Sequence, residues 1–167
     1  MTVKVGDRLP EATLSEFNET ESPGCPIGPR QIKVTEATRG KKIDIFGLPG
    51  AFTPTCSAKH VPSYLQNHDQ LKAKGVDEIW CVAVNDPFVM GAWGREQKAG
   101  GKVRMLGDGS AEFAKATGLV LDLTARGMGV RSDRYAMLVD DGVVKAISRE
   151  EPGKYEVSSA EAMLKNL

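Results

Sequence analysis

The sequence predicts an α/β fold with a mixed central sheet and flanking helices. Two strand–helix units follow one another in the middle of the chain, which indicates parallel strands joined by right-handed crossovers. A hairpin pattern near the carboxyl end adds antiparallel strands. The chain has 167 residues and shows no interdomain linker. We therefore expect a single domain over residues 1–167.

Strands are expected where short runs of apolar and β-branched residues end in turn-forming residues. These runs cover residues 43–48, 78–84, 102–106, 135–139 and 143–147. Asp140-Asp141-Gly142 separates the last two and is typical of a hairpin turn. Residues 1–40 are irregular in pattern, and the Pro- and Gly-rich stretch 22–29 is interpreted as a surface loop.

Helices are predicted over residues 56–75, 88–99, 110–117 and 159–167. In the first, apolar residues recur at helical spacing, Gly75 supplies the stop and Pro62 is expected to cause a kink. The second follows Asn85-Asp86-Pro87, which provides a cap and a first-turn proline. This order of elements resembles the thioredoxin-like fold.

Composition and charge exclude several classes of function. The 22 basic and 22 acidic side chains cancel, so there is no overall positive field for nucleic acid. The amino terminus lacks the apolar core of a signal peptide, and no apolar run is long enough to span a bilayer. We expect a cytoplasmic protein without nucleic-acid or membrane partners. Three cysteines and two histidines match no zinc-ligand spacing, so no metal is expected.

Cys56 is the strongest candidate for a reactive group. It lies on the first turn of a predicted helix directly after a strand, where free N–H groups and the helix dipole favour a thiolate. Thr53 is close enough in sequence for its hydroxyl to reach the sulfur and an incoming peroxide, although it can also simply cap the helix. Pro49 and Pro54 restrict the loop between strand and helix.

The spacing of these residues resembles the active-site signature of the peroxiredoxins. Pro49, Thr53 and Cys56 form the pattern Pro-x-x-x-Thr-x-x-Cys. The longer strings at 46–57 and 83–88 resemble the type II or five-type members, over a match that runs from about Val5 to Leu167. The resemblance implies a thiol peroxidase that reduces hydrogen peroxide and organic hydroperoxides, with Cys56 passing through a sulfenic acid.

The resemblance also implies partners and a further site residue. Glutaredoxin with glutathione, or thioredoxin, is the expected reductant, a homodimer is the expected assembly, and no metal, flavin or haem cofactor is implied. The family's arginine directly precedes an aromatic residue at a strand start, which corresponds to Arg134. A guanidinium there would favour the thiolate and bind peroxide oxygens. Pairing of Arg134 with Asp133 is the competing interpretation, and Arg131 is the alternative arginine.

The other cysteines leave the regeneration step open. Cys81 lies in an apolar strand and is interpreted as a small buried side chain, but its position resembles that of a resolving cysteine in type II relatives. Cys25 lies in the Pro- and Gly-rich loop, and residues 143–167 contain no cysteine. An external thiol is therefore expected to reduce Cys56.

The two histidines of the chain lie on the predicted helix that begins at Cys56. His60, four residues after Cys56, falls on the same helix face and is either a nearby donor or a packing residue. His68 is interpreted as a residue at the edge of the core.

A thiol-disulfide oxidoreductase normally has Cys-x-x-Cys, but Thr53 stands where the first cysteine would be. A non-enzymatic redox sensor would share the same reactive cysteine but oxidise slowly.

Overall fold

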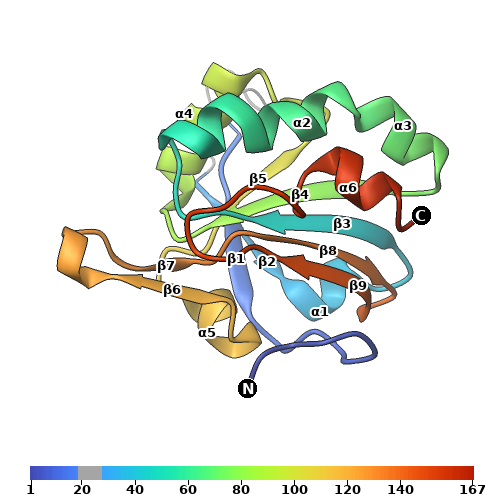
Figure 1. Cartoon of the computed structure of the whole chain (residues 1–167), viewed down its shortest axis with the longest axis horizontal. Helices are drawn as coiled ribbons and strands as arrows, with labels where there is room; N and C mark the ends of the chain where they lie inside the picture. The colour runs from blue at the N-terminus through green and yellow to red at the C-terminus, as the bar shows by residue number, and fades with distance from the viewer. Residues whose placement is uncertain (19–27) are drawn as a thin grey trace.

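The computed structural model describes residues 1–18 and 28–167. Its centre is a mixed sheet with helices on both faces, as the sequence predicts (Figure 1). Across the sheet the strands are β2 (Arg30–Lys33), β1 (Thr13–Glu16), β5 (Arg104–Gly107), β4 (Glu78–Ala83), β3 (Lys42–Gly47), β8 (Tyr135–Asp140) and β9 (Val143–Arg149). The helices are α1 (Val34–Ala37), η2 (Cys56–His60), α2 (Val61–Gln66), α3 (His68–Ala73), α4 (Pro87–Gln97), α5 (Glu112–Thr117) and α6 (Ala160–Leu164).

The strands β3, β4 and β5 run parallel and occupy the middle of the sheet. Their runs of buried residues are those expected of strands covered on both faces. Helices α2, α3, α4 and α6 cover one face, and α1 and α5 cover the other (Figure 1). The chain leaves the buried centre of the sheet at Gly47, the last residue of β3, and reaches Cys56, the first residue of η2, through residues 48–55.

The predicted hairpin is β8 and β9, with β8 paired antiparallel to β3. Its turn places Asp141 at φ 49° and Gly142 at φ 79°. Two successive positive φ values match the twist of the flanking strands, and Asp and Gly tolerate them.

Residues 1–18 and 28–40 are more ordered than their pattern predicts, because β1, β2 and α1 lie there. The buried face of β1 consists of Leu14 and Glu16, and Glu16 is only 4% exposed. Arg104 and Arg30 pair with that carboxylate at 2.9 and 3.0 Å. Because this glutamate occupies a core-facing position of β1, the four-residue strand lacks the alternation of apolar and polar residues that predicts a strand. Most of the predicted loop 22–29 lies outside the described residues.

A second hairpin was not predicted. It consists of β6 (Val120–Leu123) and β7 (Gly129–Ser132), joined by the turn η3 (Thr124–Arg126). Both strands are four residues long and mostly half-buried, so neither has a continuous apolar run. The hairpin projects from the sheet at the left of Figure 1.

The helix predicted over 56–75 is divided into three segments. A π-helix, η2, precedes Pro62, and Val61 N–H bonds to the Cys56 carbonyl. Pro62 has no N–H to donate, so the wider π turn replaces the expected kink. The break between α2 and α3 falls at Asn67 instead. Gly75, at φ 94°, ends the segment as predicted.

Helix boundaries differ at two further places. The helix predicted to begin at Ser110 begins at Glu112, because the Asp108 carboxylate accepts from the N–H groups of Phe113 and Ala114. The last helix is shorter than predicted and starts after Ser159, whose hydroxyl caps it.

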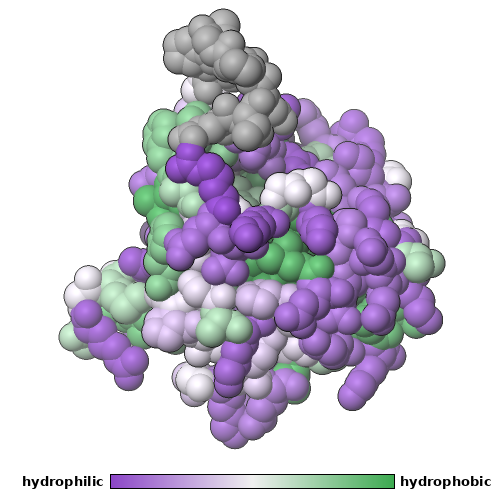
Figure 2. Space-filling model, turned by 90° about the horizontal axis from the view of Figure 1, so that it is seen from above, coloured by the Kyte–Doolittle hydropathy of each residue, from purple (hydrophilic) through white to green (hydrophobic). Residues whose placement is uncertain are grey.

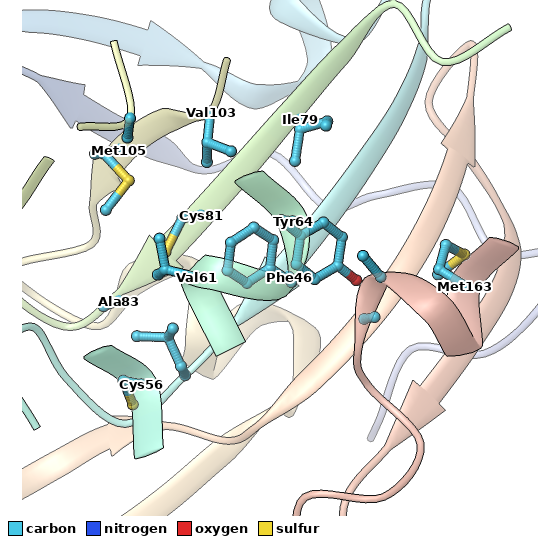
Figure 3. Close-up of a cluster of buried hydrophobic side chains, with 14 of the residues drawn as sticks. Phe46, Cys56, Val61, Tyr64, Ile79, Cys81, Ala83, Val103, Met105 and Met163 are labelled. Carbon is cyan, nitrogen blue, oxygen red and sulfur yellow. The ribbon is translucent and has the colours of Figure 1, made fainter. Parts of the chain in front are cut away.

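The side chains between the sheet and α2 form one continuous core. Figure 3 shows Phe46, Tyr64, Cys81 and Cys56 within it. Phe46 stacks on Tyr64 with ring centroids 3.9 Å apart. The outer surface is different, since hydrophilic side chains cover most of the face seen in Figure 2, with smaller apolar areas between them. Of the described residues, none forms a helix long and apolar enough to cross a membrane.

Candidate active site

Cys56 lies at the junction of the sheet and the first helical segment. Helical backbone begins at Pro54 and continues as η2, so Cys56 occupies the first turn, and its side chain is fully buried. The N–H of Ser57 bonds to the Thr53 carbonyl at 3.0 Å and closes this turn. The sulfur is therefore held at the inner end of the loop that follows β3.

Arg134 contacts the sulfur directly. Its Nη2 donates to Cys56 Sγ at 3.2 Å, from a position just before β8. The competing pairing with Asp133 does not form through the side chain, since that carboxylate accepts from the Arg134 backbone N–H and pairs with Arg149. A guanidinium beside the sulfur stabilises negative charge there.

His60 holds the other side of the same guanidinium. Arg134 Nη1 lies 2.9 Å from His60 Nδ1, and His60 Nε2 lies 2.9 Å from the Ser158 carbonyl oxygen. Burial, together with the charge of Arg134, lowers the pKa of His60 to about 3. A neutral ring with its hydrogen on Nε2 satisfies both contacts, because a carbonyl can only accept and a guanidinium can only donate. His60 is thus a hydrogen-bond partner of Arg134. This role is more specific than either role that the sequence allowed, a packing residue or a nearby donor.

Thr53 lies in the loop before Cys56 with its side chain half-buried. Its hydroxyl donates to the Gly50 carbonyl at 2.7 Å. Since a hydroxyl oxygen also has lone pairs and can rotate its hydrogen, Thr53 remains available to a bound peroxide. This hydrogen bond runs back to the loop and not to a helical N–H group.

With this geometry established, three comparisons identify the family. The Redoxin family model matches residues 4–164. Peroxiredoxin-2B of Arabidopsis thaliana is 46% identical over 165 residues, which cover 99% of this chain and 98% of that protein. The chain belongs to the type II peroxiredoxins.

Solved structures agree with this assignment. Reduced Prx3 of Vibrio vulnificus in complex with hydrogen peroxide is 47% identical, with a TM-score of 0.90 over 99% of both chains. A Burkholderia cenocepacia protein, provisionally described as a thioredoxin reductase, is 57% identical with a TM-score of 0.96, over 100% of this chain and 99% of that one. The peroxiredoxin described here has no Cys-x-x-Cys pair.

Side chains from two other parts of the chain bind the backbone of the loop before Cys56 in this peroxiredoxin. Arg131 donates from Nη1 to the Pro49 carbonyl at 3.2 Å and from Nε to the Met128 carbonyl at 2.9 Å. Asn85 Oδ1 accepts from the Ala51 N–H at 2.9 Å. Arg131 therefore binds the loop backbone, while Arg134 binds the sulfur. Sequence reasoning did not find this role of Asn85, although its place two residues after the end of β4 was a usable signal.

Cys81 lies in β4 and is fully buried, which confirms the expected strand position. Burial raises the pKa of its thiol well above the usual value, and the nearby Cys56 adds to the effect. Both cysteines are free thiols in one core cluster, on the strand and on the helix respectively (Figure 3). A disulfide between them would have to join a sheet position to a helix position inside this core. Cys25 lies outside the described residues.

His68 lies on α3, away from Cys56 in the chain. His68 is half-buried and lies 3.0 Å from the exposed carboxylate of Asp69, at the edge of the core as predicted. Within residues 1–18 and 28–167, no group of three His, Cys, Asp or Glu side chains is arranged to hold a metal ion.

A cavity of about 920 Å³ opens beside the site. Thr53 and Arg134 are among its lining residues, and Leu121, Leu123 and Met128 of the β6–β7 hairpin add apolar side chains to the lining. The unpredicted hairpin thus supplies part of the site. A cavity of this size accommodates a molecule much larger than hydrogen peroxide.

Proposed function

We propose that this peroxiredoxin reduces hydrogen peroxide and organic hydroperoxides through the thiolate of Cys56, with Arg134, Thr53 and Pro49 completing the site. The observation that carries the proposal is the 3.2 Å contact between Arg134 Nη2 and the sulfur. Negative charge moves from sulfur to the departing oxygen during the reaction, and a fixed guanidinium stabilises it throughout.

The first step oxidises the cysteine. The thiolate attacks the terminal oxygen of ROOH, the O–O bond breaks, and an S–O bond forms. The leaving RO⁻ takes a proton and departs as ROH, or as water when the substrate is hydrogen peroxide, and Cys56 becomes a sulfenic acid. In this proposal the Thr53 hydroxyl bonds the peroxide, and Pro49 keeps the loop in place through the carbonyl that Arg131 holds.

The second step restores the thiol. A thiol R′SH condenses with the sulfenic acid, releasing water and forming a mixed disulfide, and a second R′SH then releases Cys56 and R′SSR′. We propose that the first thiol comes from outside the chain, as glutathione with glutaredoxin or as thioredoxin. The burial of Cys81 and its raised thiol pKa support an external thiol over a resolving role for Cys81.

Organic hydroperoxides fit the cavity beside the site. Leu121, Leu123 and Met128 offer apolar surface to an alkyl group while the peroxide lies near Arg134. Hydrogen peroxide has no alkyl group to place against these side chains. A comparison of cumene hydroperoxide with hydrogen peroxide on Leu123→Ser tests this, since only the organic substrate should lose rate.

A homodimer is the assembly that we propose. Phe52 and Phe88 are 51% and 56% exposed, and Phe52 directly precedes Thr53. Exposed aromatic side chains beside a functional loop are typical of contact surfaces. Sedimentation equilibrium tests the assembly, with Phe88→Ser expected to shift it toward monomer.

The cytoplasmic location stays a prediction that cell fractionation can test.

The experiment that tests the function is peroxide consumption with defined reductants. Glutaredoxin with glutathione is compared with thioredoxin and its reductase, using wild type and Cys56→Ser. Turnover with at least one reductant, lost in Cys56→Ser, supports the proposal. A redox sensor would instead react at the rate of a free thiol.

A further inference from the structure

We infer that Glu150 is a positioning residue for the Cys56 site. It acts through the loop 151–158, which fixes the tautomer of His60 and thereby the place of Arg134. The inference rests on the proposed function, because the site that it positions is the peroxidase site.

The Glu150 carboxylate forms hydrogen bonds with several groups of the loop 151–158. It lies just after β9 and is only 5% exposed. Its oxygens accept from the N–H groups of Glu156, Val157 and Ser158 at 2.8 to 3.0 Å, and from the Ser158 hydroxyl at 2.7 Å. Burial opposes its ionisation, but these hydrogen bonds hold the pKa of the carboxyl below its usual value. Three consecutive amides on one carboxylate leave the loop little freedom.

The fixed loop presents the Ser158 carbonyl to the core. That oxygen lies 2.9 Å from His60 Nε2 and accepts from the Tyr64 hydroxyl at 3.1 Å. Because a carbonyl can only accept, His60 carries its hydrogen on Nε2, and the lone pair of Nδ1 faces Arg134. The position of one loop carbonyl therefore favours the tautomer that can bind Arg134.

The same loop supports the site from a second side. Its Tyr155 ring packs edge-on against His60, with centroids 5.2 Å apart. Arg134 Cζ lies 6.0 Å from the centre of the Tyr155 ring. A ring face near a guanidinium adds an electrostatic attraction. Release of the loop would remove the carbonyl and the ring together.

A chain of contacts thus joins Glu150 to the sulfur, through the loop, His60 and Arg134. If the Ser158 carbonyl moves, the His60 hydrogen can shift to Nδ1 and oppose the guanidinium. Arg134 then loses its second anchor while Cys56 itself is unchanged. A change at Glu150 is therefore expected to lower the oxidation rate of Cys56 without touching the reacting atoms.

Glu150→Gln tests this, because glutamine has similar shape but turns an NH₂ group toward the loop amides. The second-order rate constant for oxidation of Cys56 should fall on the order of tenfold. In an Arg134→Gln background, Glu150→Gln should add little, since its effect passes through the arginine. Fully additive losses would overturn the inference. The matched control is Glu161→Gln, which removes the same charge in α6 but can still accept from Asn67.

The ring nitrogens of His60 give a readout that simple destabilisation would not move. Nitrogen-15 NMR should show the neutral Nε2–H tautomer in wild type and a substantial Nδ1–H population in Glu150→Gln, with His68→Gln used for assignment. An unchanged tautomer in a slowed variant would contradict the inference. Ser158→Ala, which removes only the hydroxyl bond to Glu150, should give a smaller shift in the same direction and replaces the glutamine variant if that fails to fold. Wild type that cannot reduce peroxide would contradict the proposed function alone, because the tautomer is read without peroxide.

Discussion

The guanidinium of Arg134 donates to the sulfur of Cys56 from a residue 78 positions away in the chain. Its second nitrogen is held by His60. Two anchors on one planar group fix both its place and its plane, which a single contact would not.

Arg134→Gln is expected to slow Cys56 oxidation on the order of a hundredfold, even at a pH where the thiolate predominates, because peroxide binding is lost as well. Stopped-flow fluorescence with hydrogen peroxide measures the rate. Arg131→Gln is the matched comparison, since Arg131 holds the Pro49 carbonyl and not the sulfur. A larger loss in Arg131→Gln would show that the assignment of the two arginines is wrong.

Thr53→Val keeps the shape of the side chain and removes its hydroxyl. We expect the rate of oxidation to fall by about tenfold to a hundredfold, because the bound peroxide loses a hydrogen-bond partner. Thr55→Val, one residue before Cys56, is the control for a lost hydroxyl in the adjoining first helical turn. Equal rate constants for Thr53→Val and wild type would leave Thr53 a purely structural role.

Asp44 gives a prediction about stability and pH. It is fully buried in β3, and neither carboxylate oxygen has a hydrogen-bond partner among the described residues. Burial raises its pKa well above the usual value. Since the folded-state pKa exceeds the unfolded one, the contribution of Asp44 is most favourable below the unfolded pKa and is lost as pH rises toward the folded value.

Asp44→Val should therefore raise the free energy of unfolding at pH 7 by about 1 to 3 kcal/mol, and it should flatten the decline toward alkaline pH. Urea unfolding across the neutral range measures both effects. Glu96→Gln, at an exposed carboxylate of α4, is the matched control for loss of one negative charge. A less stable Asp44→Val protein would mean that Asp44 has a stabilising partner in solution.

Much of this fold follows from local patterns in the sequence. The central strands and the hairpin turn at Asp141 are predicted by apolar runs and turn residues. β1 is missed because Glu16 is buried through ion pairs with Arg104 and Arg30, which only the folded chain brings together. The β6–β7 hairpin is missed because its strands are short and half-buried.

The candidate site was likewise predicted only in part from the sequence. Cys56, Thr53, Pro49 and Arg134 were found through a spaced motif and a family resemblance, although their catalytic roles stay predictions. The contacts of His60 were not predictable, since Ser158 and Arg134 are 98 and 74 residues distant in sequence. No local pattern encodes which carbonyl will face a buried ring nitrogen.

The cysteines give a prediction about regeneration. Cys81→Ser should retain turnover with glutathione and glutaredoxin, because the buried thiol of Cys81 is not needed. Intact-mass analysis after one equivalent of peroxide, followed by glutathione, should show a mixed disulfide on Cys56. Loss of turnover in Cys81→Ser, with a Cys56–Cys81 bridge in wild type, would replace the external-thiol cycle with a two-cysteine cycle.

The most direct test of the central claim is the stopped-flow rate of Cys56 oxidation by one equivalent of hydroperoxide, measured in wild type and Cys56→Ser. The account predicts that wild type reacts orders of magnitude faster than free cysteine and yields a sulfenic acid on Cys56, while Cys56→Ser shows no fast phase. A wild-type rate equal to that of free cysteine, or a fast phase that survives in Cys56→Ser, would contradict it.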